Sequence, residues 1–233
     1  MRVAWVIAAC LIALTNAPDR LLATEAPSGL REYLRSEMHE LEIPGMQVAV
    51  VQHGKIVLFA ALGLADVENH LPVTEGTVFP IASATKAFTG VALMQLVESG
   101  KLELTAPVSR YLNSLPSPWR SVTIRQLATH ISGLPNLVNN DTGQLVTGVQ
   151  IACATQADWD AAWAKAQTMP METVPGEKYS YNQTNYILLG QVIDKVSGEP
   201  FTQFIKDRQL DLVGMPSTIY GVRVRKTRRV RKA

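Results

Sequence analysis

"FPIASATKAFTG", residues 79–90, combines three features that decide how the surrounding chain folds. Pro80 interrupts the chain, Ser83 follows it, and Lys86 comes three residues later, in front of an apolar run with helical spacing. Side chains at positions i and i+3 of a helix lie on the same face and can contact each other. The stretch therefore predicts a helix whose first turn carries a hydroxyl and an amine side by side.

This pair of side chains suits nucleophilic catalysis. A serine hydroxyl is a weak nucleophile at neutral pH and needs a base beside it. A lysine can act as that base where desolvation and positive potential favour its neutral form, and a helix N-terminus supplies such potential. The free N–H groups of the same turn can also stabilise an oxyanion. Ser83 and Lys86 are thus candidate catalytic residues, although Ser-x-x-Lys also occurs by chance in ordinary capped helices.

Patterns on both sides of this stretch predict an α+β protein. Apolar residues with helical spacing predict a helix over residues 30–41, and residues 46–63 predict a β-hairpin around a His-Gly-Lys turn. The remaining chain predicts mainly helices, among them one after the capping box Thr155–Asp158 and one that ends at Gly198. With 233 residues, 47% of them apolar, the chain suits one domain, or one core with an insertion.

Four segments together resemble one known family. These are "FPIASATKAFTGVALMQLVESGKL" (79–102), "VTIRQLATHISGLP" (122–135), "PGEKYSYNQTNYILLG" (175–190) and "LVGMPST" (212–218). In this order they are similar to motifs of the serine β-lactamase and penicillin-binding protein family. The resemblance is to the branch that holds class C β-lactamases, D-alanyl-D-alanine carboxypeptidases and related esterases.

The resemblance implies a fold and a set of roles. The implied fold is β-lactamase/transpeptidase-like, with an antiparallel sheet, flanking helices and a helical subdomain. Ser83 matches the nucleophile that forms an acyl-enzyme, and Lys86 matches the lysine that activates it. Tyr181 matches the tyrosine that carries the proton to the leaving group and later activates water, which requires positive neighbours to lower its pKa. The implied substrate is a β-lactam, a D-alanyl peptide or a small ester.

Two departures from the family pattern affect the expected activity. The family has Tyr-x-Asn, whereas this chain has Tyr181-Asn182-Gln183, so the substrate-binding amide is either Gln183 or Asn182 in a shifted register. The family's third motif, a Lys-Thr-Gly-like triplet whose strand completes the oxyanion hole, has no clear counterpart. Lys226-Thr227 is followed by Arg228, whose side chain would obstruct the close approach that glycine permits. We therefore expect weak activity, and the alternative is a non-catalytic remnant that at most binds ligands.

The two ends of the chain differ from its centre. Residues 1–23 predict a signal peptide, with Arg2 ahead of a short apolar run, so we expect a periplasmic or secreted protein. Residues 24–221 then form the family-like domain, and residues 1–221 together carry a net charge of −5. Residues 222–233 hold seven basic residues and no acidic one. This tail could bind polyanions or be a solvated extension, but the abrupt loss of family pattern favours a lost coding frame and missing C-terminal strands.

Other chemistry has little support in the sequence. The four histidines are scattered, and no metal-binding spacing, phosphate loop or dinucleotide fingerprint is present, so we expect no metal and no cofactor. The expected partner is a small-molecule or peptide substrate. We expect no nucleic-acid partner, with the basic tail as the one feature that favours it, and no membrane span after signal cleavage.

Overall fold

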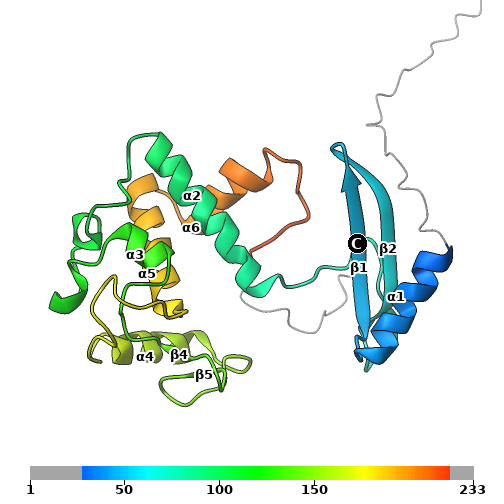
Figure 1. Cartoon of the computed structure of the whole chain (residues 1–233), viewed down its shortest axis with the longest axis horizontal. Helices are drawn as coiled ribbons and strands as arrows, with labels where there is room; N and C mark the ends of the chain where they lie inside the picture. Colours follow the sequence, from blue (N-terminus) through cyan, green and yellow to red (C-terminus); the bar gives the residue numbers. More distant parts are fainter. Residues whose placement is uncertain (1–27, 221–233) are drawn as a thin grey trace, which may run out of the picture. The chain divides into compact units, whose positions relative to one another are not determined.

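The computed structural model describes residues 28–220, which divide into one unit that ends at Phe79 and a second that begins at Pro80 (Figure 1). The predicted signal peptide and basic tail lie outside the described residues. The described part contains helices and antiparallel strands, with the two long strands grouped next to each other in the first unit, which confirms the α+β class. No helix within these residues is long and apolar enough to cross a bilayer.

A β-hairpin forms the centre of the first unit. Its elements are α1 (Ser28–Glu40), β1 (Gly45–Gln52), β2 (Lys55–Asp66) and β3 (Leu71–Pro72), with the strands in the order β1-β2-β3 and antiparallel. The hairpin turn has positive φ at both His53 (50°) and Gly54 (74°), which matches the right-handed twist of the flanking strands. α1 packs on the hairpin through Met38 against Leu58 and Leu62. Both the helix and the hairpin were predicted from residue spacing.

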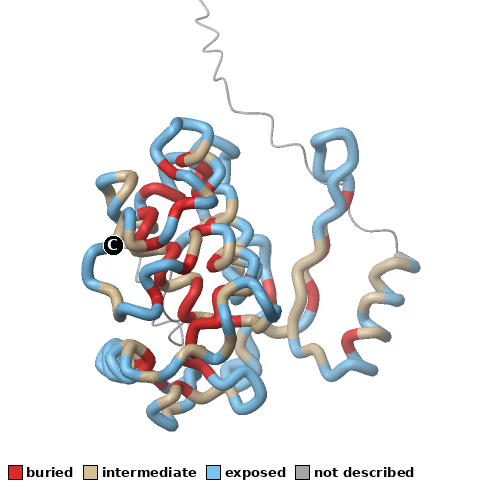
Figure 2. Tube along the Cα trace, turned by 60° about the vertical axis from the view of Figure 1, so that its left-hand side comes forward, coloured by how far each residue is buried: buried red, intermediate tan, exposed pale blue. Residues whose placement is uncertain are grey.

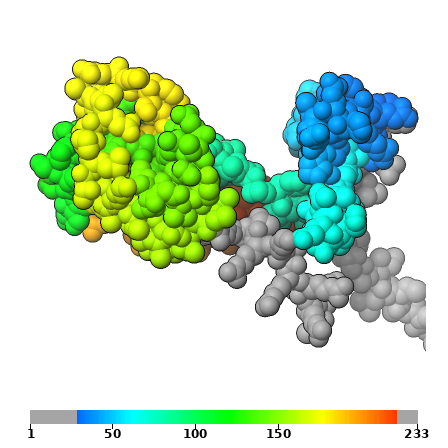
Figure 3. All heavy atoms as spheres, turned by 90° about the horizontal axis from the view of Figure 1, so that it is seen from below, coloured from blue at the N-terminus to red at the C-terminus, as the bar shows by residue number. Residues whose placement is uncertain are grey.

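The second unit is mainly helical. Its elements are η1 (Ala82–Thr85), α2 (Lys86–Glu98), η2 (Val108–Arg110), η3 (Ser117–Trp119), α3 (Ile124–Ala128), β4 (Val138–Asn139), β5 (Gln144–Leu145), α4 (Gln156–Ala166), α5 (Gln183–Ser197), α6 (Phe201–Ile205) and the π-helical turn η4 (Lys206–Leu210). Within this unit, residues 130–180, coloured green to yellow, form one continuous surface (Figure 3).

The core of the second unit lies where α2, α3 and α5 meet. α2 supplies Leu93 and Leu96, and α5 supplies Leu188 and Val192, all of which are buried. Buried segments gather in the interior of this unit in Figure 2. Since α2 and α5 carry both this core and the family-like motifs, their packing fixes the positions of the motif side chains.

Local sequence signals set the ends of these helices. Thr155 caps α4 in a reciprocal capping box with Asp158, as predicted, and Thr123 caps α3 in the same way with Gln126. α5 ends at Gly198, which has a positive φ of 82° and closes the helix in the left-handed conformation. The short strands β4 and β5 were not predicted, because two residues are too few for a period to be recognised.

Candidate active site

Ser83 lies just ahead of the central helix of the second unit, in the turn η1. The sequence predicted both Ser83 and Lys86 on one helix, but α2 begins only at Lys86 and the preceding turn is a 3₁₀-helix. Side chains at i and i+3 eclipse each other in a 3₁₀-helix, so the tighter turn brings this pair into closer register than an α-helix would. Ala82, directly before the serine, has a φ of 45°, a strained value of the kind found near functional groups.

The side chains of Lys86 and Tyr181 both contact Ser83, as the sequence predicted for this cluster. The Lys86 Nζ atom donates to Ser83 Oγ at 3.2 Å, and the Tyr181 hydroxyl donates to the same oxygen at 2.6 Å. Ser83 is exposed, whereas Lys86 and Tyr181 are half-buried. The structure therefore presents a hydroxyl to solvent with an amine and a phenol on its inner side, which is the arrangement a serine nucleophile needs.

Lys86 also contacts groups on α5. Its Nζ atom donates to Gln183 Oε1 at 3.1 Å, and lies 4.7 Å from the ring centroid of Tyr181 and 5.0 Å from that of Tyr186. Aromatic faces attract an ammonium group at such distances. The amine is thus held between two rings, a hydroxyl and an amide, and its position relative to Ser83 is fixed from several directions.

The environment of Tyr181 favours its ionised form. Burial raises the pKa of this phenol, but hydrogen bonding from Lys86, Ser83 and Gln183, together with the charge of Lys86, outweighs burial and brings the pKa below its ordinary value of 10. A lowered pKa increases the fraction of Tyr181 that is ionised at a given pH, and the phenolate is the form that can accept a proton from a neighbouring hydroxyl. Tyr181 can therefore act as the proton carrier at this site.

The structure separates the two amides that the sequence left as alternatives. Asn182 is buried, and its Nδ2 atom donates to the Leu134 carbonyl at 2.6 Å, so its side chain lies in the interior and not at Lys86. Gln183 presents its Oε1 atom to Lys86 instead, while its backbone N–H donates to Asn136 Oδ1 at 2.9 Å. The extra methylene of glutamine thus reaches the position at which the amide contacts the lysine.

Two residues that the sequence analysis did not single out hold the tyrosine segment. Asn140 Nδ2 donates to the backbone carbonyl of Tyr181 at 2.6 Å, and Asn136 Nδ2 donates to the same oxygen at 3.3 Å. The signal that could have found them is the group of asparagines in the five residues after the "SGLP" turn, where a loop has to satisfy backbone groups of a neighbouring segment. Asn136 therefore touches both Tyr181 and Gln183.

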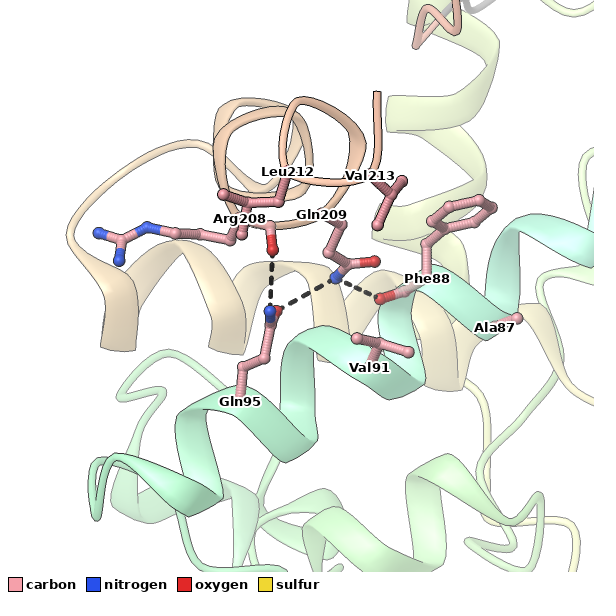
Figure 4. Close-up of a pocket in the computed structure, with 8 residues that line it drawn as sticks. All are labelled: Ala87, Phe88, Val91, Gln95, Arg208, Gln209, Leu212 and Val213. Carbon is pink, nitrogen blue, oxygen red and sulfur yellow. Dashed lines mark hydrogen bonds between the residues drawn. The ribbon is translucent and has the colours of Figure 1, made fainter. Parts of the chain in front are cut away.

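An apolar groove of about 350 Å³ lies along α2 but does not include this cluster. Figure 4 shows its lining, with Val91, Leu212 and Val213 around an amide ladder in which Gln209 donates to the Phe88 carbonyl at 3.0 Å. Ser83 itself lies outside the groove, on the exposed surface. Among residues 28–220, no group of three or more acidic, histidine or cysteine side chains is placed to hold a metal ion.

The fold and this cluster define a class of proteins. A serine and a lysine one turn apart at the head of a central helix, with a tyrosine delivered by the start of a second helix, are the features of β-lactamase/transpeptidase-like proteins that the sequence motifs implied. The β-lactamase family model matches residues 30–233, and the chain belongs to this family.

Individual relatives agree with the family assignment. Esterase EstB from Burkholderia gladioli is 30% identical over 76% of this chain and 47% of its own length. The octameric penicillin-binding protein homologue from Pyrococcus abyssi is 33% identical, with a TM-score of 0.66 over 81% of this chain and 43% of its own. A class C β-lactamase is 26% identical, with a TM-score of 0.65 over 81% of this chain and 48% of its own.

These comparisons confirm the predicted family and fold, and they also show how much of each relative the chain matches. The chain spans less than half the length of the curated relatives it matches. The family match includes the turn η1 with Ser83, the helix α2 that begins at Lys86, and Tyr181 just ahead of α5.

Proposed function

We propose that this chain is an exported serine hydrolase that acts by acyl transfer through Ser83. The observation that carries this proposal is the convergence of Tyr181 and Lys86 on one exposed hydroxyl, at 2.6 Å and 3.2 Å from Ser83 Oγ. Because the three groups come from the family's motif positions, the family's acyl-enzyme chemistry is the natural assignment.

The geometry supports a balanced sequence of steps. Ionised Tyr181 takes the proton of Ser83, whose Oγ forms a bond to the carbonyl carbon of the substrate, while the ammonium of Lys86 stabilises the negative charge. The tetrahedral intermediate collapses as the C–N or C–O bond breaks, and Tyr181 returns the proton to the departing nitrogen or oxygen. Water then attacks the acyl carbon as its proton passes to Tyr181. The bond between the acyl carbon and Ser83 Oγ breaks, Tyr181 returns the proton to Oγ, and the carboxylic acid product leaves.

The substrate is a β-lactam, a D-alanyl peptide or a small ester, which all present an acyl carbonyl to the nucleophile. The likeness to an esterase supports a small ester as substrate, and the likeness to a class C β-lactamase supports a β-lactam. The 233 residues contain no clear counterpart of the family's third motif, which supplies an oxyanion donor. Loss of one such donor typically costs about 10²- to 10³-fold in turnover, so we expect the chain by itself to be slow.

Hydrolysis of p-nitrophenyl butyrate and nitrocefin by the purified protein tests this proposal. Slow release of product from either substrate, abolished in Ser83→Ala and unchanged in Ser99→Ala on the far end of α2, is the expected result. A rate that Ser83→Ala leaves intact assigns the hydrolysis to another group and contradicts the proposal. Absence of both turnover and covalent labelling of Ser83 favours the non-catalytic alternative.

Export to the periplasm or the medium is the second part of the proposal. It rests on the apolar run of residues 3–14 behind Arg2 and on the small residues that follow, with processing after Ala23. N-terminal sequencing of the protein recovered from a bacterial host tests it. A mature N-terminus at Thr24 in the exported fraction is expected, whereas an intact Met1 in the cytoplasm contradicts export.

A further inference from the structure

His130 is a buried histidine next to the candidate active site that the acyl-transfer steps do not use. It follows α3, it is only 7% exposed, and its backbone adopts a positive φ of 60°. A residue other than glycine takes this conformation at a cost, and such strain persists only where the surroundings enforce it. The contacts of His130 show what it is held there to do.

Both peptide neighbours of Tyr181 are bonded to this one histidine. The backbone N–H of Ser180 donates to the His130 carbonyl at 2.8 Å, and the backbone N–H of Asn182 donates to its Nδ1 atom at 3.1 Å. The imidazole also packs against the phenol ring of Tyr181, with the ring centroids 4.7 Å apart. His130 therefore holds Tyr181 through the residue that precedes it, through the residue that follows it, and through its ring.

The hydrogen bonds define the protonation state of the imidazole. Two donors point at Nδ1, since the Asn185 amide lies 3.4 Å from it as well as the Asn182 N–H. The Oδ1 atom of Asn185 accepts from Ser132 Oγ at 2.6 Å, which leaves its Nδ2 group to face the histidine. An Nδ1 atom that accepts hydrogen bonds carries a lone pair, so the neutral ring has its proton on Nε2.

Resting on the proposed function, we propose that His130 is a positioning residue that holds Tyr181 on Ser83 only while its imidazole is neutral. A proton on Nδ1 would face the Asn182 N–H donor, and the bond behind Tyr181 would be lost. Displacement of a catalytic group by about 1 Å can cost about 10²-fold in rate. Acidification would therefore slow acylation through His130 in addition to its effect on the catalytic groups themselves.

The surroundings of the ring resist this protonation. Within the described residues, the titratable groups that face it are Lys86 from α2, Tyr179 and Tyr181 from the loop before α5, and Tyr186 from α5. Burial is the main cause that lowers the pKa of His130 below its ordinary 6.5, and the positive charge of Lys86 lowers it further. The neutral, holding state is consequently the one present at neutral pH.

Two variants of His130 separate the hydrogen bond from the ring. His130→Asn places an acceptor oxygen at the same δ position, tolerates positive φ, and cannot be protonated in this range, whereas His130→Ala provides no acceptor. Both variants lose the ring packing. The rate of fluorophosphonate labelling at Ser83, followed from acid to alkaline pH, is the readout, with thermal unfolding as the check on overall stability.

We expect His130→Asn to label within about threefold of the wild type near pH 8, and His130→Ala to label about 10- to 100-fold more slowly. At acid pH, the labelling rate of the wild type should show an additional decrease, due to protonation of His130, that the labelling rate of His130→Asn does not show. Equal rates for the two variants at all pH values, or a wild-type profile with the same acid side as His130→Asn, would overturn the proposal.

Nitrogen NMR of the full chain distinguishes failure of this inference from failure of the proposed function. If the wild type does not label at Ser83, the acyl-transfer proposal fails, but the state of His130 is still measurable. An unprotonated Nδ1 at pH 7, assigned by loss of the signal in His130→Asn, supports the positioning role when carbon NMR also shows a displaced Tyr181 ring signal in His130→Ala alone. A protonated Nδ1 at pH 7 would refute it whatever the labelling shows.

Discussion

Gln183→Asn would restore the residue that the family usually has, and we expect it to slow acylation in this chain. The backbone of Gln183 is held by Asn136, so removal of one methylene withdraws the amide oxygen by about one C–C bond, roughly 1.5 Å. The present separation between Oε1 and the Lys86 Nζ atom is 3.1 Å. The shorter side chain would leave about 4.6 Å, which is beyond hydrogen-bond distance.

The expected size of the effect follows from the loss of one bond to a charged donor. Such a bond contributes about 1.5–3 kcal/mol, which corresponds to about 10- to 150-fold in rate if Lys86 loses its place in the transition state. The assay is the second-order rate of fluorophosphonate labelling at fixed pH. Gln156→Asn, the same chemical change on the exposed start of α4, serves as the control and should label like the wild type.

The outcome of this comparison also tests whether Gln183 serves as the amide of the family's Tyr-x-Asn motif. A Gln183→Asn variant that labels as fast as the wild type, or faster, would show that the contact between Gln183 and Lys86 does not support catalysis. The reasoning from the reach of the longer side chain would then be refuted.

Three further predictions concern the tyrosine and the fold that holds it. Carbon NMR should show Tyr181 ionising below pH 10 in the wild type and at higher pH in Lys86→Met, because the charge that lowers its pKa is gone; an unchanged titration would contradict this. Thr123→Ala removes the cap of α3 and should lower the free energy of unfolding by about 1 kcal/mol, seen as a lower urea midpoint with an unchanged slope. Gly133→Ala should cost more, at least about 2 kcal/mol in the same assay, since its φ is 69° and a Cβ atom would lie 2.1 Å from the Thr173 carbonyl; a midpoint equal to the wild type would contradict the described backbone.

Spacing was sufficient to predict the longer helices and the hairpin, because the apolar residues of a buried face recur at a regular interval over many positions. It also predicted the neighbourhood of Ser83 and Lys86, since residues three apart in any tight helical turn share a face. It could not show that this turn is 3₁₀-helical, because residues three apart share a face in a 3₁₀ turn as well as in an α-helix.

The choice between Asn182 and Gln183 lay beyond the sequence for a different reason. The side chains of Asn182 and Gln183 carry the same amide group. Which of them turns into the interior depends on where a hydrogen-bond partner lies in the folded chain. In the structure the Leu134 carbonyl accepts from Asn182, and this long-range contact across 48 residues commits Gln183 to Lys86. His130 and Asn136 were missed as positioning residues because their bonds to the Tyr181 segment join parts of the chain that are far apart in sequence.

Peptide mass spectrometry after incubation with a fluorophosphonate tests the central claim most directly. If Lys86 and Tyr181 activate Ser83, the adduct forms on the peptide that contains Ser83, and Lys86→Met almost abolishes it while the protein stays folded. An adduct on another residue, or a Lys86→Met variant labelled at Ser83 as fast as the wild type, would contradict the claim.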